Sequence, residues 1–203
     1  LGYFDESLSI DCVQAIANAG AAEVVVHGRT KVQAYTPPAY WDKIAVLKES
    51  VGIPVIANGE IWTITDARQC YLDSGCESIM LGRGIVADPG LALAIRSNIP
   101  TQKIHKNWYI AKSISNGLEF APATGQISWE ELQPHFVSFW DLVQQSIEVK
   151  AQTGRMKQWL NYLRRRYPEA EIAYETLKRD KNPLSVTNWL NELNFCNKIQ
   201  IKN

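Results

Sequence analysis

The chain has 203 residues, 46% of them hydrophobic, which is enough to bury one large core or two smaller ones. Its 21 basic and 21 acidic residues balance, so overall charge predicts no polyanionic partner, and any basic patch must be local. The four cysteines are far apart and form no C-x-x-C pair, which argues against a disulfide framework or a zinc site. No apolar run reaches the roughly 18 residues of a membrane span, and no signal peptide is visible. We therefore expect a cytoplasmic protein with no membrane span and no bound metal.

Three strands, each followed by a polar turn, are expected in the first half of the chain. Unbroken runs of apolar, β-branched residues are typical of strands that are covered on both faces in a parallel sheet. The strands are predicted over 23–28, 53–57 and 78–81, and the helices over 9–19, 40–51 and 63–74. Successive units of this kind predict a parallel β/α barrel or a doubly wound sheet.

The number of units favours part of a barrel. A complete β/α barrel takes about 250 residues and eight units, whereas three units are recognisable here, preceded by the end of another strand at Leu1–Tyr3. The alternatives are a half-sized sheet and a barrel whose first half is missing. We expect the C-terminal half of a TIM-type α/β barrel, because a missing first half also explains a start without methionine.

The second half of the chain is predicted to be all helix. The α/β alternation stops at 98–100, so we expect a half-barrel at 1–98 and a helical domain at 99–203. Ser128 is the expected N-cap of the first helix of that domain, with Glu131 as the capping-box acid. Gly154 is expected to break the helical pattern. The predicted helices are 129–153, 155–167, 168–178 and one that begins after Pro183.

Polar residues follow each of the three strands at equivalent places, where α/β folds gather their ligand groups. Gly82, Arg83 and Gly84 have the features of a phosphate site, because glycines let the backbone approach an anion and Arg83 adds a fork of donors. A plain turn with a solvated arginine is the alternative. The other strand-end residues are His27, Asn58, Gly59 and Glu60.

Two of these strand-end residues have simpler explanations. His27 by itself is more often a buried histidine satisfied by the backbone, and Glu60 either binds a ligand hydroxyl or caps the next helix. In the loop after His27, Arg29 and Tyr35 either face a polyanion or are solvated. We favour a ligand-binding site, because His27, Asn58 and Gly82 occupy equivalent positions at the ends of three successive strands.

The predicted helix over 155–167 has a basic face without an acidic residue. A charged outer face is usual for a surface helix, but the absence of acids in a neutral chain favours contact with a phosphate backbone. The face holds Arg155, Lys157, Gln158, Asn161, Arg164 and Arg165, with Arg166 nearby. We interpret all four cysteines as small, buried apolar residues.

Three segments, VVVHGRTKVQAY, IPVIANGEI and IMLGRG, followed by an all-helical region, resemble the tRNA-dihydrouridine synthases. The segment RMKQWLNYLRR is similar to the bacterial subgroup C, which acts on uridine 16 of the tRNA D-loop. The resemblance covers nearly the whole chain, and it is the combination of motifs that makes it specific.

The resemblance implies an FMN-containing barrel joined to a helical tRNA-recognition domain. NADPH would reduce the flavin, which passes a hydride to C6 of a flipped-out uracil while a cysteine protonates C5. His27 would lie against the isoalloxazine ring, and Tyr35 would approach the tRNA. Asn58, Gly59, Glu60, Gly82 and Arg83 would bind FMN; Arg29, Arg155, Lys157, Gln158 and Arg164 would serve the tRNA surface.

Two features of the family are absent from these 203 residues. The catalytic cysteine belongs to an N-x-x-G-C-P-type loop, and none of Cys12, Cys70, Cys76 or Cys196 has that context. The flavin-facing lysine, expected just before Leu1, is also missing. We therefore expect that this polypeptide alone neither binds FMN tightly nor reduces uridine; a stoichiometric yellow flavin on purification would contradict this.

Two other functions stay open at this stage. The chain is alternatively a non-catalytic tRNA-binding module, or part of another flavin- or phosphate-binding barrel enzyme. The second alternative leaves the basic helix unexplained. In each case we expect a monomer.

Overall fold

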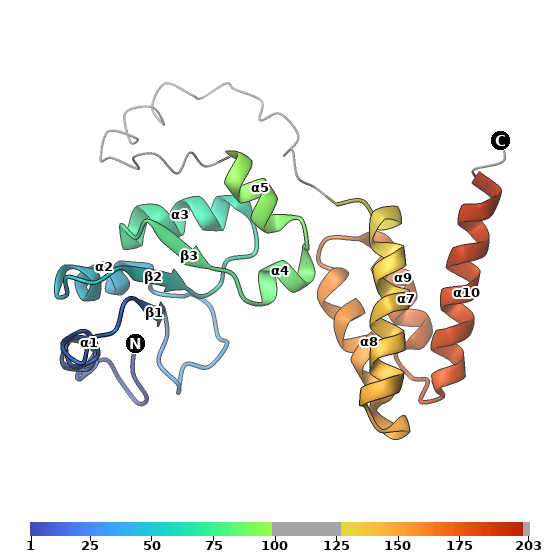
Figure 1. Cartoon of the computed structure of the whole chain (residues 1–203), viewed down its shortest axis with the longest axis horizontal. Coiled ribbons are helices and arrows are strands. Elements are labelled where there is room, and N and C mark those ends of the chain that lie inside the picture. The colour runs from blue at the N-terminus through green and yellow to red at the C-terminus, as the bar shows by residue number, and fades with distance from the viewer. Residues whose placement is uncertain (99–126, 201–203) are drawn as a thin grey trace. The chain divides into compact units, whose positions relative to one another are not determined.

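The computed structural model describes residues 1–98 and 127–200, with side chains placed through residue 193. The described residues form two compact units, one from 1–85 and 90–98 and the other from 86–89 and 127–200. Figure 1 shows strands with helices in the first unit and helices alone in the second. None of the described helices combines the length and apolar character needed to cross a membrane.

The first unit is built on a parallel sheet of three strands in the order β1-β2-β3. The strands are β1 (Val24–His27), β2 (Val55–Asn58) and β3 (Ser78–Met80), and the helices between them are α2 (Trp41–Glu49) and α3 (Ile64–Ser74). Helix α1 (Ser9–Asn18) precedes β1. These elements confirm the strand and helix positions expected from the sequence.

Helices cover one face of this sheet. Ile44 of α2 and Cys70 of α3 are fully buried against Val26, Val55 and Ala57 of the strands. On the other face Val25 is 40% exposed and Met80 is 44% exposed. The sequence predicted strands buried on both faces, but within the described residues helices cover only one face of the sheet. The three described strands form an open sheet and no closed barrel.

A short contact adds to the edge of β1. Gly2 and Thr30 form an isolated parallel bridge, and the amide of Lys31 donates to the carbonyl of Gly2 at 2.9 Å. The first residues thus run beside the end of β1, as expected for the end of a further strand.

The helical unit has its own core. It contains α7 (Trp129–Ser146), α8 (Val149–Leu163), α9 (Pro168–Leu177) and α10 (Pro183–Gln200), while α4 (Arg83–Ala87) and α5 (Leu91–Asn98) follow β3. Phe136, Met156, Leu160 and Leu163 are completely buried in this core. At the start of α7, Ser128 accepts from the amide of Glu131 and the Glu131 carboxylate accepts from the amide of Ser128, which confirms the predicted capping box.

The break between the first two helices of this unit was predicted at the wrong residue. Helix α7 ends at Ser146, and Ile147 is extended with φ −121° and ψ 139°. Gln152 is buried and donates from Nε2 to the carbonyls of Ile147 and Gln144, which satisfies the end of α7. Gly154 lies inside α8, because a single glycine costs a helix only about 1 kcal/mol. Helix α8 also ends earlier than predicted, at Leu163.

Replacing Gly154 by alanine is expected to stabilise the helical unit by about 0.5–1 kcal/mol. Gly154 is exposed, and an added Cβ meets no atom within 4 Å, so the helical backbone keeps its conformation while the unfolded chain loses freedom. Urea denaturation followed by circular dichroism at the helical band measures the change. A destabilised variant would show that this glycine has a packing role.

Candidate functional site

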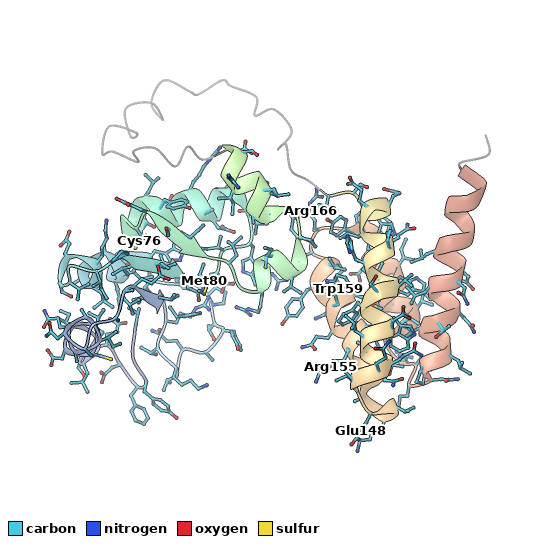
Figure 2. All side chains as sticks on the ribbon, in the orientation of Figure 1. Cys76, Met80, Glu148, Arg155, Trp159 and Arg166 are labelled. Carbon is cyan, nitrogen blue, oxygen red and sulfur yellow. The ribbon has the colours of Figure 1, made fainter. Side chains whose placement is uncertain are left out.

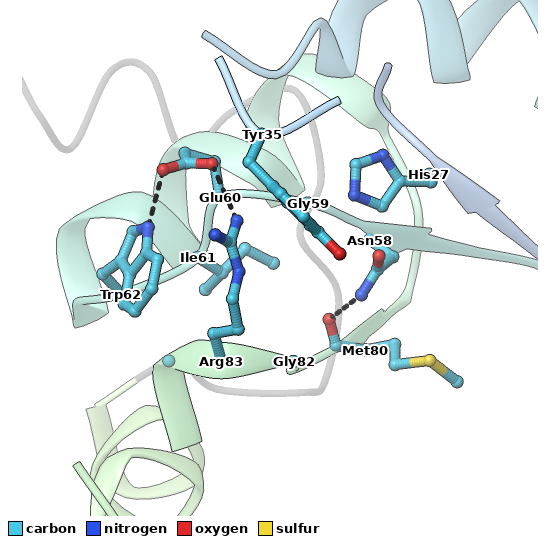
Figure 3. Close-up of a pocket in the computed structure, with 11 residues that line it drawn as sticks. His27, Tyr35, Asn58, Gly59, Glu60, Ile61, Trp62, Met80, Gly82 and Arg83 are labelled. Atoms are coloured by element: carbon cyan, nitrogen blue, oxygen red, sulfur yellow. Dashed lines mark hydrogen bonds and ion pairs between the residues drawn. The ribbon is translucent and has the colours of Figure 1, made fainter. Parts of the chain in front are cut away.

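The three strands end side by side in one layer. His27 pairs in register with Asn58, and Asn58 with Met80. The Asn58 side chain donates from Nδ2 to the Met80 carbonyl at 2.8 Å, which ties the ends of β2 and β3 together (Figure 3). The structure thus brings together the strand-end residues that the sequence singled out.

The backbone after Asn58 turns through two residues with positive φ. Gly59 has φ +124° and Glu60 has φ +53°. A Cβ on Gly59 would lie 3.3 Å from Ala39 Cβ and 3.5 Å from the His27 ring. The Gly59 carbonyl accepts from Trp41 Nε1 at 2.9 Å. This turn directs the Glu60 side chain toward the other charged residues of the site.

Glu60 is the centre of a network of charged and aromatic side chains. It pairs with the Arg29 guanidinium, accepts from Trp62 Nε1 at 2.8 Å, and lies 3.5 Å from Arg83 Nη2. Burial raises the pKa of Glu60, but the Arg29 and Trp62 hydrogen bonds and the two cations outweigh it and lower the pKa overall. Glu60 is therefore a carboxylate at neutral pH.

Glu60 does not cap the following helix. The N-cap of α3 is Thr63, which forms a capping box with Asp66. Of the two roles left open for Glu60 by the sequence, capping is excluded. The carboxylate holds two arginines instead.

Arg29 differs from both alternatives that the sequence offered. It is 2% exposed, so it is neither solvated nor placed on the surface where a tRNA contact was expected. Its Nε donates to the Pro38 carbonyl at 3.1 Å, and its Nη1 is buried without a hydrogen-bond partner. Residues 31 positions apart supply this buried ion pair, a distance at which the sequence carries no local signal.

Arg83 lies between two aromatic rings. Its guanidinium carbon is 4.3 Å from the centroid of Tyr35 and 5.1 Å from that of Trp62. Tyr35 is 69% exposed, and its expected contact with tRNA stays a prediction. Trp62 was not predicted for this site. Its position two residues after Glu60 in the sequence could have indicated that it lies near the Glu60 carboxylate.

The backbone at Gly84 approaches the neighbouring turn closely. A Cβ there would lie 2.0 Å from the Ile61 carbonyl oxygen, so only glycine fits. Together these residues line a pocket of about 230 Å³ (Figure 3). It includes His27, Asn58, Gly59, Glu60, Gly82 and Arg83.

His27 stays neutral at this pocket. Partial burial, followed by the charge of Arg29, lowers the pKa of His27 from the ordinary value of 6.5. A neutral imidazole has one donor and one acceptor nitrogen. The site thus combines a guanidinium, a neutral imidazole, an amide and a carboxylate, a set suited to an anionic ligand with hydroxyl groups.

We expect the free energy of unfolding to fall when the pH is lowered from about 7.5 to 5.5. The folded pKa of His27 is depressed, so its contribution is fully present above the unfolded pKa of 6.5 and is lost as the pH falls below it. Urea denaturation at the two pH values measures the change. The His27→Asn variant should lose less stability over this range; an equal loss would contradict the prediction.

The residues expected to face tRNA in the helical unit have different surroundings. Arg155 and Gln158 are exposed, with Arg155 Nη1 at 3.4 Å from Gln158 Oε1. Lys157 donates from Nζ to the Asp180 carbonyl at 2.8 Å. Arg164 lies 3.4 Å from Glu171 and over the ring of Tyr174, so α9 supplies an acid to a face that the sequence indicated was free of acids.

The cysteines only partly follow expectation. Cys70 and Cys76 are buried, and burial raises the pKa of the Cys70 thiol to about 12. Cys12 is exposed, which corrects the prediction that all four are buried. The side chain of Cys196 lies outside the described residues. Within the described parts of the chain, no three histidine, cysteine or acidic residues are grouped as metal ligands.

The structure defines a parallel α/β protein with an arginine- and glycine-lined pocket at the carboxyl ends of its strands, where α/β folds place their ligand sites. The sequence model of the dihydrouridine synthase (Dus) family matches residues 2–179, and the chain belongs to this family.

Similar proteins carry the name tRNA-dihydrouridine(16) synthase. One from Pseudomonas syringae pv. tomato is 43% identical over 180 residues, 89% of this chain and 50% of the relative. One from Aquipseudomonas alcaligenes is 40% identical over 182 residues, which are 90% of this chain and 51% of the relative. One from Neisseria meningitidis serogroup B is 33% identical over 193 residues, which are 95% of this chain and 52% of the relative. The chain thus spans about half the length of these relatives.

Proposed function

We propose that this chain is the C-terminal portion of an enzyme that reduces uridine to 5,6-dihydrouridine in the tRNA D-loop, at position 16. The observation that carries the proposal is the pocket at the carboxyl ends of β1–β3, in a chain that belongs to the dihydrouridine synthase family. The sheet would then be half of a TIM-type barrel, and the proton-donating cysteine would come from the part of the enzyme outside these residues.

The pocket fits the phosphate and ribityl end of FMN. Arg83 would donate to the phosphate, and the Glu60 carboxylate would accept from a ribityl hydroxyl. Gly59, Gly82 and Asn58 would leave room for the ligand, and His27 would lie against the ring system. The pocket volume of about 230 Å³ is below the usual range for a whole cofactor site, so we assign only one end of FMN to it. Bound FMN would supply the reducing equivalents that it takes from NADPH.

The tRNA would contact both units. Tyr35 is exposed beside Arg83 at the pocket, and Arg155 and Gln158 are exposed on α8. Lys157 and Arg164 would add positive charge, although both side chains also make contacts within the protein. We propose a monomeric cytoplasmic protein, and we assign Arg29 to holding Glu60 rather than to the tRNA.

Dihydrouridine mapping tests this function. In tRNA from a strain that lacks the gene, dihydrouridine should disappear at position 16 and return when the gene is restored. An Arg83→Ala gene should fail to restore it, whereas Lys150→Ala, which changes an exposed lysine on α8, should restore it. Dihydrouridine that persists at position 16 in the deletion strain would refute the proposal.

A tRNA-binding module without catalysis is the second candidate. It is favoured by α8, which carries basic residues and no acidic residue. The affinity of the chain for tRNA, measured against salt concentration, should fall steeply if several phosphates are neutralised. Such a fall, with dihydrouridine unchanged in the deletion strain, would favour this candidate.

A further inference from the structure

One side of α8 carries four side chains that share a hollow on the helical unit. Arg155, Gln158, Trp159 and Tyr162 follow one another at the i, i+3, i+4 and i+7 spacing that places residues on one helix face. With Phe139 of α7 and Val86, which groups with the same unit, they line a hollow of about 370 Å³. Figure 2 labels Arg155 and Trp159 along this helix.

Aromatic rings line this hollow and pack against neighbouring rings. The Trp159 ring meets the edges or faces of Phe136 and Phe139 at centroid distances of 4.9 Å in both cases, with interplanar angles of 67° and 68°. Phe136 is completely buried in the core, whereas Trp159, Tyr162 and Phe139 are only partly buried. Such a half-open aromatic surface suits a flat ligand that stacks.

The rim of the hollow is polar and positive. Arg155 and Gln158 are both exposed and lie 3.4 Å apart at Nη1 and Oε1. Helix α8 contains no acidic residue, and the Arg155 guanidinium forms no ion pair among the described residues. By contrast, Lys157 donates to the Asp180 carbonyl after α9, and Arg164 pairs with Glu171 of α9. A flat apolar wall beside an amide and a guanidinium that forms no ion pair among the described residues is complementary to a base with its phosphate.

We propose that this hollow binds an unpaired nucleobase of an RNA ligand, with Gln158 contacting the edge of the base and Arg155 an adjacent phosphate. The inference rests on the proposed function, which supplies tRNA as the ligand, and adds a base-binding subsite on the helical unit. A paired base is excluded by its neighbours in the duplex from entering such a hollow. The charge of the rim favours RNA over an apolar segment of a protein.

The test uses the 203-residue chain labelled with 5-fluorotryptophan and observed by fluorine NMR. The Trp159 resonance is assigned by its absence in Trp159→Phe. A single-stranded RNA of about 12 nucleotides should shift this resonance, and the same strand in a duplex should leave it in place. In a binding titration, Gln158→Ala should weaken single-strand binding about tenfold and leave duplex binding unchanged.

One control variant completes the design. Lys150→Ala removes an exposed cation of α8 outside the hollow and should change the affinity for both RNAs by the same factor. Circular dichroism checks that each variant is folded. The proposal is overturned if single-stranded RNA binds without moving the Trp159 resonance, if the duplex moves it equally, or if the resonance responds only to self-association of the chain.

The outcomes separate this proposal from the proposed function. Full tRNA binding with an unmoved Trp159 resonance would overturn the base-binding hollow alone. Absence of binding to tRNA and to both model RNAs would overturn the hollow and also count against a tRNA surface on this chain. Loss of dihydrouridine in the deletion strain would still support the enzymatic role in either case.

Discussion

Replacing Gly84 by alanine is expected to lower the free energy of unfolding of the sheet unit by about 3 kcal/mol. The new Cβ would lie 2.0 Å from the carbonyl oxygen of Ile61, and 3.2 Å from Leu91 Cδ2. A backbone oxygen cannot rotate away as a flexible side chain does, so the turn after β2 or the start of α4 must shift. Amide hydrogen exchange in β2 and β3 measures the change in this unit alone.

The matched control is Gly82→Ala, two residues earlier in the same turn. A Cβ at Gly82 meets no atom within 4 Å, so the stability should change by less than about 0.5 kcal/mol. The Gly84 variant should also restore little dihydrouridine to the deletion strain, because the displaced segment carries Arg83. Equal stability of the two variants would show that the close approach at Gly84 has no energetic role.

Replacing Arg29 by methionine is expected to cost about 3 kcal/mol, the lower end of the range for breaking a buried ion pair. The Arg29 side chain is fully buried and pairs with Glu60, whose own side chain is 19% exposed. Glu60 keeps the Trp62 hydrogen bond and the more distant Arg83, which moderates the loss. The same hydrogen-exchange measurement gives the change in stability.

Arg83→Met is the comparison, because Arg83 meets the same carboxylate at 3.5 Å but is 32% exposed. Solvent screens such a pair, so its loss should cost about 1 kcal/mol or less. The double variant Arg29→Met, Glu60→Leu should be more stable than Arg29→Met alone, since both charges are then gone. If Arg83→Met lowers the free energy of unfolding as much as Arg29→Met does, burial does not determine how much each ion pair stabilises the sheet unit.

Features set by neighbouring residues were predictable. The strands follow from runs of β-branched residues, and the capping box from Ser128 and Glu131 three residues apart. Parallel strands bring their carboxyl ends to one edge, which is why the strand pattern alone was enough to place His27 and Asn58 in one site. These inferences depend only on backbone geometry and local hydrogen bonds.

The two errors concern side-chain partners that the sequence pattern did not indicate. Gly154 is a weak helix former, yet the break falls at Ile147, because Gln152 satisfies the carbonyls at the end of α7. Arg29 was placed on the surface, because an exposed arginine in a loop is the usual case, and its partner Glu60 lies on a different strand end. The first outcome depends on a side-chain hydrogen bond between neighbouring turns of the chain, and the second on a partner 31 residues away.

The sequence by itself determined the parallel strands, the helices of the second half and the gathering of polar residues at the strand ends, because hydrophobic periodicity and cap chemistry act over a few residues. Only the tertiary structure decided which charges are buried, that Arg83 lies between Tyr35 and Trp62, and that α8 shares an aromatic hollow with α7. Burial and ring contacts depend on residues far apart in the chain, whose approach is set by packing rather than by local preference.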